Sequence, residues 1–182
     1  AALRLSYVIP ATLLLIFVLL YFNFRNPVAP AVVMLTVPFA LVGGFWLVYW
    51  YNYNLSVAVA VGFIALAGVA VETGVLVLTF IQEALHERRS EKGGGTLSSG
   101  EIVDAVKTGT SRRVRPVVMT ATSTIVGLLP IMFIDGTGAD VMQRIAAPMI
   151  GGMITTLLLS LLVLPVIYSL AAEMMERVGV TD

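Results

Sequence analysis

One carboxylate of this sequence lies where a bilayer would offer no water to solvate it. Glu72 stands near the middle of an apolar run, whereas the other acidic residues fall in loops, at the ends of apolar runs or in the tails. An ionised carboxylate at that depth costs on the order of 2.5–3.5 kcal/mol on insertion scales. Burial favours the protonated form, and a nearby cation or hydroxyl donor favours the ionised form. Glu72 is therefore a candidate proton relay, and the alternative is a purely structural role.

The helical face that carries Glu72 predicts where its side chain points. Gly68 and Ala65 lie one and two turns before it on the same face. Small residues let a neighbouring helix approach closely, so we expect Glu72 to point towards other helices and away from lipid. The whole face comprises Val61, Ala65, Gly68, Glu72, Leu76 and Thr79.

Two later apolar runs carry small and hydroxyl residues at helical spacing, which favours a shared polar interior. The alternative is that these residues only mediate tight helix packing, as they do in many membrane bundles. The first set is Thr120, Ser123, Thr124 and Gly127, and the second is Gly152, Thr156 and Ser160.

Soft-metal chemistry depends on methionine in this chain, because it contains no cysteine and therefore no thiolate ligand or disulfide. Most of the eight methionines lie in apolar runs, where methionine is ordinary core material. Met142 is the exception, since it lies in a short polar segment between two apolar runs, and it is a candidate metal ligand. His86 is isolated and is interpreted as a solvated residue.

The elements that must position these residues are membrane helices. The sequence is 58% hydrophobic and only 12% charged, which is typical of a bilayer protein and not of a soluble domain. Five apolar runs are long enough to cross about 30 Å of hydrocarbon, and their prolines are expected to kink the helices without ending them. We therefore predict an all-α membrane protein with five transmembrane helices. The predicted spans are 5–22, 28–51, 55–81, 117–134 and 145–172.

The basic residues predict the orientation of these spans. One side of the alternating topology carries nine of the eleven basic residues, and the other side carries only Arg4 and Arg144. This bias predicts a cytoplasmic loop at 82–116, a periplasmic N-terminus and a cytoplasmic C-terminus. Because the N-terminus must then be translocated and Ala1 is not preceded by a signal peptide, we expect the chain to be part of a longer polypeptide. The nine residues are Arg25, Arg88, Arg89, Lys92, Lys107, Arg112, Arg113, Arg115 and Arg177.

The predicted cytoplasmic loop contains a helix of its own. Ser98 and Glu101 have the spacing of a capping box, after a turn-rich stretch at 93–96 whose triple glycine is either natural or an engineered splice. Ile102, Val103 and Val106 then form an apolar stripe. This pattern indicates a short helix on the membrane surface, and the alternative is a solvated connector.

Four motifs, in order, resemble the resistance-nodulation-division superfamily, and in particular its heavy-metal efflux branch of the copper/silver type. They are VPFALVGG at 37–44, GFIALAGVAVE at 62–72, RVRPVVMT at 113–120 and RIAAPMIGG at 144–152. The resemblance implies the last five of twelve transmembrane helices in a bacterial inner-membrane, proton-driven antiporter. It further implies missing N-terminal and periplasmic parts, a homotrimer, a periplasmic adaptor and an outer-membrane channel.

The resemblance also implies roles for three residues. Glu72 matches a glutamate of the proton-relay network, and Met142 matches a methionine of a stepwise path for Cu(I) or Ag(I). Thr120 matches a relay threonine of the related multidrug pumps, in which a lysine occupies the position of Glu72. One position departs from the copper/silver pattern, because Val117 stands where that type has a relay lysine.

Several alternatives stay open on sequence. Pumps for zinc, cobalt and cadmium also lack that lysine, and the same scaffold exports drugs or other organic solutes. A membrane assembly module without transport is a further alternative. Balanced charge gives no sign of a nucleic-acid partner, and the sequence has no phosphate-binding loop, nucleophile–base pair or metal-ligand cluster at a usable spacing, so no bound cofactor is expected. We therefore expect a secondary transporter, not an enzyme.

Overall fold

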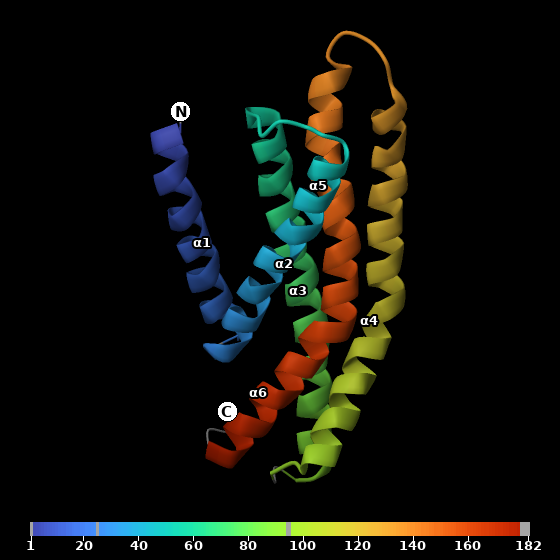
Figure 1. Cartoon of the computed structure of the whole chain (residues 1–182). Helices are drawn as coiled ribbons and strands as arrows, with labels where there is room; N and C mark the ends of the chain where they lie inside the picture. The colour runs from blue at the N-terminus through green and yellow to red at the C-terminus, as the bar shows by residue number, and fades with distance from the viewer. Residues whose placement is uncertain (1, 25, 94–95, 179–182) are drawn as a thin grey trace.

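A computed structural model describes residues 2–24, 26–93 and 96–178, and these ranges fold into helices without strands (Figure 1). Five helical segments are long and apolar enough to cross a membrane, which confirms the predicted fold class. The long helices are α1 (Ala2–Phe24), α2 (Val28–Trp50), α3 (Val57–Glu91), α4 (Ser99–Leu128), α5 (Ala139–Leu158) and α6 (Leu164–Val178).

Some sequence predictions concern residues beyond this description. Arg25, Gly94 and Gly95 lie outside the described residues, so the triple glycine and one of the nine basic residues have no structural account. The side chains of Arg4 and Arg177 are not described either. The orientation derived from the basic residues therefore stays a prediction.

Helices α2, α3 and α5 form the centre of the bundle, and glycines set how closely they approach. A Cβ on Gly151 of α5 would meet the carbonyl oxygen of Gly43 on α2, and one on Gly62 of α3 would lie 2.5 Å from the carbonyl oxygen of Ile145. Such contacts leave room only for hydrogen, because main-chain atoms of a packed helix cannot move aside cheaply. Few residues in the membrane part of α1 are buried, so α1 lies at the edge of the bundle (Figure 1).

The last span bends between α5 and α6. One π-helical turn, Leu159–Val163, joins them, and the ribbon of α6 tilts away from the axis of α5 (Figure 1). Pro165 explains the bend, because its ring removes a hydrogen-bond donor and crowds the carbonyl one turn earlier. Pro10, Pro38 and Pro148 lie within helices, as expected. Pro130 instead lies in a 3₁₀ turn, Leu129–Phe133, that follows α4.

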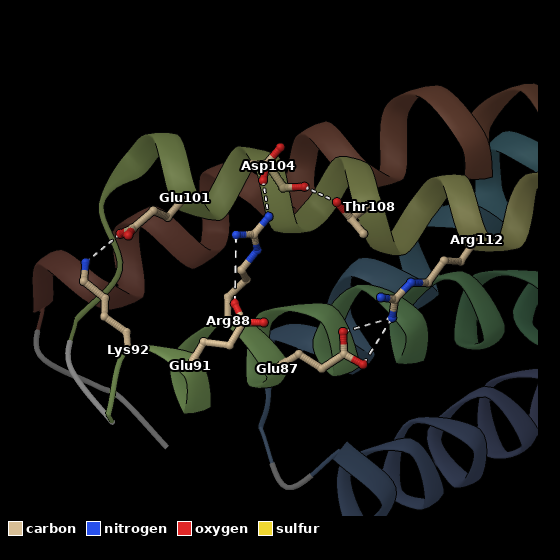
Figure 2. Close-up of polar contacts among 8 residues, drawn as sticks. All are labelled: Glu87, Arg88, Glu91, Lys92, Glu101, Asp104, Thr108 and Arg112. Carbon is tan, nitrogen blue, oxygen red and sulfur yellow. Dashed lines mark hydrogen bonds and ion pairs between the residues drawn. The ribbon is translucent and has the colours of Figure 1, made fainter.

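Helices α3 and α4 extend beyond their apolar parts as a hairpin held by ion pairs (Figure 2). The predicted capping box is confirmed: the Ser98 hydroxyl accepts from the Glu101 amide, and the Glu101 carboxylate accepts from the Ser98 amide at 2.7 Å. Ion pairs between described residues connect the two helices or their ends. They are Arg88–Asp104 at 2.5 Å, Arg112–Glu87 at 3.0 Å and Lys92–Glu101 at 2.7 Å.

The helix that begins at Ser99 differs from the prediction in two respects. It is not a separate surface helix, because α4 continues without a break through Pro116 into the fourth span. Most of its stripe also faces protein: Ile102 and Val106 are buried, although Val103 is exposed, and a Cβ on Gly109 would lie 2.6 Å from the carbonyl oxygen of Phe80. The physical reason is that one buried stripe runs along α4 on both sides of Pro116, so the part before the proline and the part after it pack as a single helix. Its members are Ile102, Ala105, Val106, Gly109, Thr110, Val117 and Ala121.

Candidate functional site

A cavity of about 240 Å³ lies between α3, α4 and α5, and it brings together residues from three separate spans. Glu72 from α3 and Thr120 from α4 both line it. The structure therefore brings these two candidate relay residues to the same cavity. The other lining residues are Val69, Thr73, Leu76, Val117, Ala121, Thr124, Met153, Thr156 and Leu157.

Four threonine hydroxyls line this cavity, and each donates to a main-chain carbonyl of its own helix. Because a hydroxyl oxygen has two lone pairs, each of these oxygens can still accept a hydrogen bond after its proton has been donated. A protonated carboxyl group or a water molecule in the cavity could be such a donor. The pairs are Thr73 to Val69 at 2.9 Å, Thr120 to Pro116 and Val117 at 3.0 Å, Thr124 to Thr120 at 2.9 Å, and Thr156 to Gly152 at 2.7 Å.

Glu72 itself is exposed in this chain, which corrects the expectation that its small-residue face packs against a neighbouring helix. A Cβ on Gly68 would meet no atom within 4 Å, and Ala65 is exposed as well. A different stripe of α3, next to the predicted face, packs against α2 and α5. It includes Gly62 and Gly74. Within the described ranges, the carboxylate therefore borders the cavity on one side and the outside of the bundle on the other.

The position that departs from the copper/silver pattern also belongs to this cavity. Val117 is buried and lines it, so a lysine at this position would extend from the same wall as Thr120. One helical turn earlier, Arg113 places its guanidinium 4.6 Å from the centre of the Phe80 ring. Its Nε atom is buried without a hydrogen-bond partner in the described structure. The cation nearest in sequence to this wall of the cavity is thus Arg113, which lies one helical turn before Val117 at the edge of the fourth span.

The other residues of the two stripes only partly form the expected polar interior. Thr124 and Thr156 line the cavity, Gly152 packs against Leu66, and Ser160 is buried within the π-helical turn. Ser123 and Gly127 are exposed and line no part of the cavity, which corrects the expectation for these two positions. Sequence reasoning did not single out Thr73, the residue after Glu72. A helix turns by about 100° per residue, and a cavity between three helices is wide enough to include two adjacent positions.

Met142 lies at the opposite end of its span from the hairpin, in the first turn of α5, and 51% of its surface is exposed. It does not line the cavity of Glu72. The structure therefore separates the candidate metal ligand from the candidate relay. Among the described residues, no group of three or more histidine, cysteine, aspartate or glutamate side chains could hold a metal ion. His86 is exposed, on the hairpin side of α3.

Residues 1–172 match the AcrB/AcrD/AcrF family. The chain is 48% identical over 167 residues to the cation efflux system protein CusA of Escherichia coli K12, and these residues are 92% of this chain but 16% of the relative. It is 42% identical over 171 residues to the cobalt-zinc-cadmium resistance protein CzcA of Cupriavidus metallidurans, 94% of this chain and 15% of the relative.

A solved structure supports the same relationship. The chain superimposes on the crystal structure of a heavy metal efflux pump with a TM-score of 0.78 and 37% identity, covering 93% of this chain and 15% of that one. The sequence therefore spans about one sixth of the length of the proteins that it matches.

Proposed function

The chain belongs to the AcrB/AcrD/AcrF family, on the heavy-metal efflux branch of the resistance-nodulation-division superfamily, and on this premise we propose its role in a complete transporter. We propose that it forms five membrane helices of a proton-driven exporter in the bacterial inner membrane. Cu(I) and Ag(I) are the proposed substrates. The identity to CusA, which exceeds the identity to CzcA, supports this choice.

The observation that carries the proton-driven mechanism is the cavity shared by Glu72 and Thr120. In our proposal, the Glu72 carboxylate takes a proton from the periplasmic side and releases it to the cytoplasmic side during each transport cycle. The threonine oxygens around the cavity accept hydrogen bonds from the protonated carboxyl group or from water, which holds the transferred proton in place. The exposed face of α3 is where helices from the rest of the protein supply the acidic partner of Glu72.

Met142 has a separate role in this proposal. Its thioether lies at the mouth of α5, where an exposed soft ligand can pass Cu(I) or Ag(I) to or from other methionines of the complete protein. The end of the bundle that carries the α3–α4 hairpin is proposed to be cytoplasmic, in agreement with the excess of basic residues there. A homotrimer with a periplasmic adaptor and an outer-membrane channel completes the proposed assembly.

The substrate proposal can be tested with the full-length protein in liposomes that contain a pH-sensitive dye. We expect a proton flux when Ag(I) or Cu(I) is supplied, and none with an organic cation such as ethidium. A proton flux with ethidium but not with the metals would contradict the metal proposal and support the drug-exporting alternative. A proton flux with Zn(II) alone would support a proton-driven metal exporter but would contradict Cu(I) and Ag(I) as its substrates.

A further inference from the structure

The short segment between α2 and α3 holds Tyr53 in a defined position. Asn52, just before it, lies in the left-handed region at φ 53°, a conformation that asparagine adopts more readily than most residues. The Asn52 amide donates to the carbonyl of Tyr49 at 3.0 Å, and the Tyr53 amide donates to the carbonyl of Val48 at 3.1 Å. These two bonds form a Schellman motif, which closes the end of α2 and fixes the direction of the chain at Tyr53.

The side chain of Tyr53 connects this segment to the first turns of α5, at the same end of the bundle (Figure 1). Its hydroxyl donates to the Oε1 atom of Gln143 at 3.2 Å. The guanidinium carbon of Arg144 lies 5.3 Å from the centre of its ring, where a cation is attracted by the aromatic face. Tyr51 stacks on the same ring, with the ring centres 5.7 Å apart. One side chain of the α2–α3 segment therefore contacts two successive residues of α5.

The start of α5 depends on such contacts, because it has no side-chain cap. Its N-cap residue is Gly138, at φ 90°, which offers no side-chain oxygen to the first amides of the helix. Gln143 instead ties this turn to the end of the fourth span, since its Nε2 atom donates to the carbonyl of Ile134 at 2.9 Å. The segment 134–143 is thus closed by Gln143, and Tyr53 holds Gln143 from outside the segment.

Met142 lies within this closed segment, directly before Gln143. Its amide donates to the carbonyl of Gly138 at 3.3 Å, and 51% of its surface is exposed. A methionine side chain is unbranched and has three rotatable bonds, so its sulfur has a defined position only if the backbone that carries it is fixed. A ligand group that is held in place before binding loses less conformational entropy when it binds.

We propose that Tyr53 is a positioning residue for Met142. Through Gln143 it fixes the first turn of α5, and with it the place at which the thioether meets Cu(I) or Ag(I). The inference rests on the proposed role of Met142 as a soft ligand, and it adds a residue from another element on which that role depends. Tyr53 itself does not contact the metal, and the role of Glu72 is not involved.

The test measures the binding of Ag(I) at Met142 in the full-length protein in detergent. A methionine-selective oxaziridine modifies the free thioether, and Ag(I) on the sulfur blocks this reaction. Mass spectrometry of the peptide that contains Met142 then gives the Ag(I) concentration that halves the modification. We expect Tyr53→Phe, which keeps the ring and removes the hydroxyl, to raise this concentration about fivefold, because one hydrogen bond is lost. Gln143→Leu should raise it at least as much, and it carries the test if Tyr53→Phe does not assemble.

Tyr51→Phe is the matched control and should leave the Ag(I) concentration unchanged. It removes a hydroxyl from the ring stacked on Tyr53, and that hydroxyl makes no hydrogen bond with the residues that the structure describes. An equal increase in Tyr51→Phe and Tyr53→Phe would overturn the inference, because it would indicate a general disturbance of the two rings.

Two further results separate this inference from the proposed role of Met142. If Ag(I) protects Met142 equally well in wild type and in an assembled Tyr53→Phe protein, Met142 remains a ligand and the positioning role of Tyr53 is wrong. This holds even if Tyr53→Phe changes the rate of modification without metal, since that change would show only a structural effect. If Ag(I) does not protect Met142 in wild type, the proposed ligand role is contradicted, and the inference fails with it.

Discussion

Glu72 on α3 and Thr120 on α4 line the same cavity, although a long hairpin separates them in the sequence. The hairpin sets this register. Its ion pairs and the close approach of Gly109 to Phe80 hold the two helices together at one end, and the cavity opens between them further along. A threonine and a carboxylate thereby come to share a polar space in the apolar part of the bundle.

The Thr120 hydroxyl is expected to contribute to transport through its oxygen. Thr120→Ala removes that oxygen from the cavity, and we expect export of Ag(I) by the full-length protein to fall several-fold, whereas Thr120→Ser retains most activity. The control is Thr79→Ala, because Thr79 has the same kind of hydroxyl-to-carbonyl bond on α3 and does not line the cavity. Equal activity of Thr120→Ala and wild type in a metal-uptake assay with inverted vesicles would remove Thr120 from the relay.

Met142 is expected to act as a soft ligand. Met142→Leu preserves size and removes the sulfur, so the export of Ag(I) should decrease while the stability of the protein stays the same. Met119→Leu is the control, because Met119 is also exposed but lies on α4 within the span. The same decrease in both variants, measured as silver tolerance of cells at equal protein levels, would contradict a specific role for Met142.

The crossing of α2 and α5 is expected to tolerate no side chain. In Gly151→Ala the new Cβ would lie 2.8 Å from the Cβ of Leu47 and would also meet the carbonyl oxygen of Gly43, so overpacking should cost about 1–3 kcal/mol. Gly100→Ala has no atom within 4 Å of the new Cβ and should be neutral or slightly stabilising. Thermal unfolding of the two variants in detergent gives the comparison. A Gly151→Ala protein as stable as wild type would show that the crossing is looser than described.

Acid should loosen the start of α4 only well below neutral pH. The hydrogen bond from Lys92, together with those from Ser98, lowers the pKa of Glu101 from 4.5 to about 2. A carboxylate with a lowered pKa stabilises the folded state above its unfolded pKa, and this contribution is lost as the pH falls from about 4.5 towards 2. Hydrogen exchange around Glu101, corrected for the intrinsic rate, should be constant from pH 7 to 5 and faster below 4. Glu101→Gln should abolish this pH dependence, and a transition near pH 6 in wild type would contradict the assignment.

Local patterns in the sequence predicted those features that depend on neighbouring residues alone. The capping box at Ser98 and Glu101 and the five membrane-spanning helices are of this kind, since spacing and hydropathy determine them. Local patterns did not predict which face of α3 is buried. Two stripes of small residues, one through Gly68 and one through Gly62, run side by side, and only the positions of α2 and α5 decide which of them is buried.

The same limit applies to the site. Glu72 could be found from its charge in an apolar run, and Thr120 from the hydroxyl stripe of its run and from the family resemblance. Thr73 and Met153 line the cavity for reasons of packing that no periodicity shows. The continuity of α4 through Pro116 was missed as well, because the proline and the charged residues before it have the composition of a span boundary. Burial of one stripe against α3 overrides that local preference.

The proton-relay role of Glu72 is tested most directly by metal-dependent proton flux through the full-length protein in liposomes. Glu72→Gln keeps the size and polarity of the side chain but cannot carry a proton, so the flux should disappear while the proposed trimer still assembles. Glu83→Gln, an exposed glutamate of α3 that does not line the cavity, should behave like wild type. A Glu72→Gln protein that still couples Ag(I) export to proton movement at the wild-type rate would contradict the account.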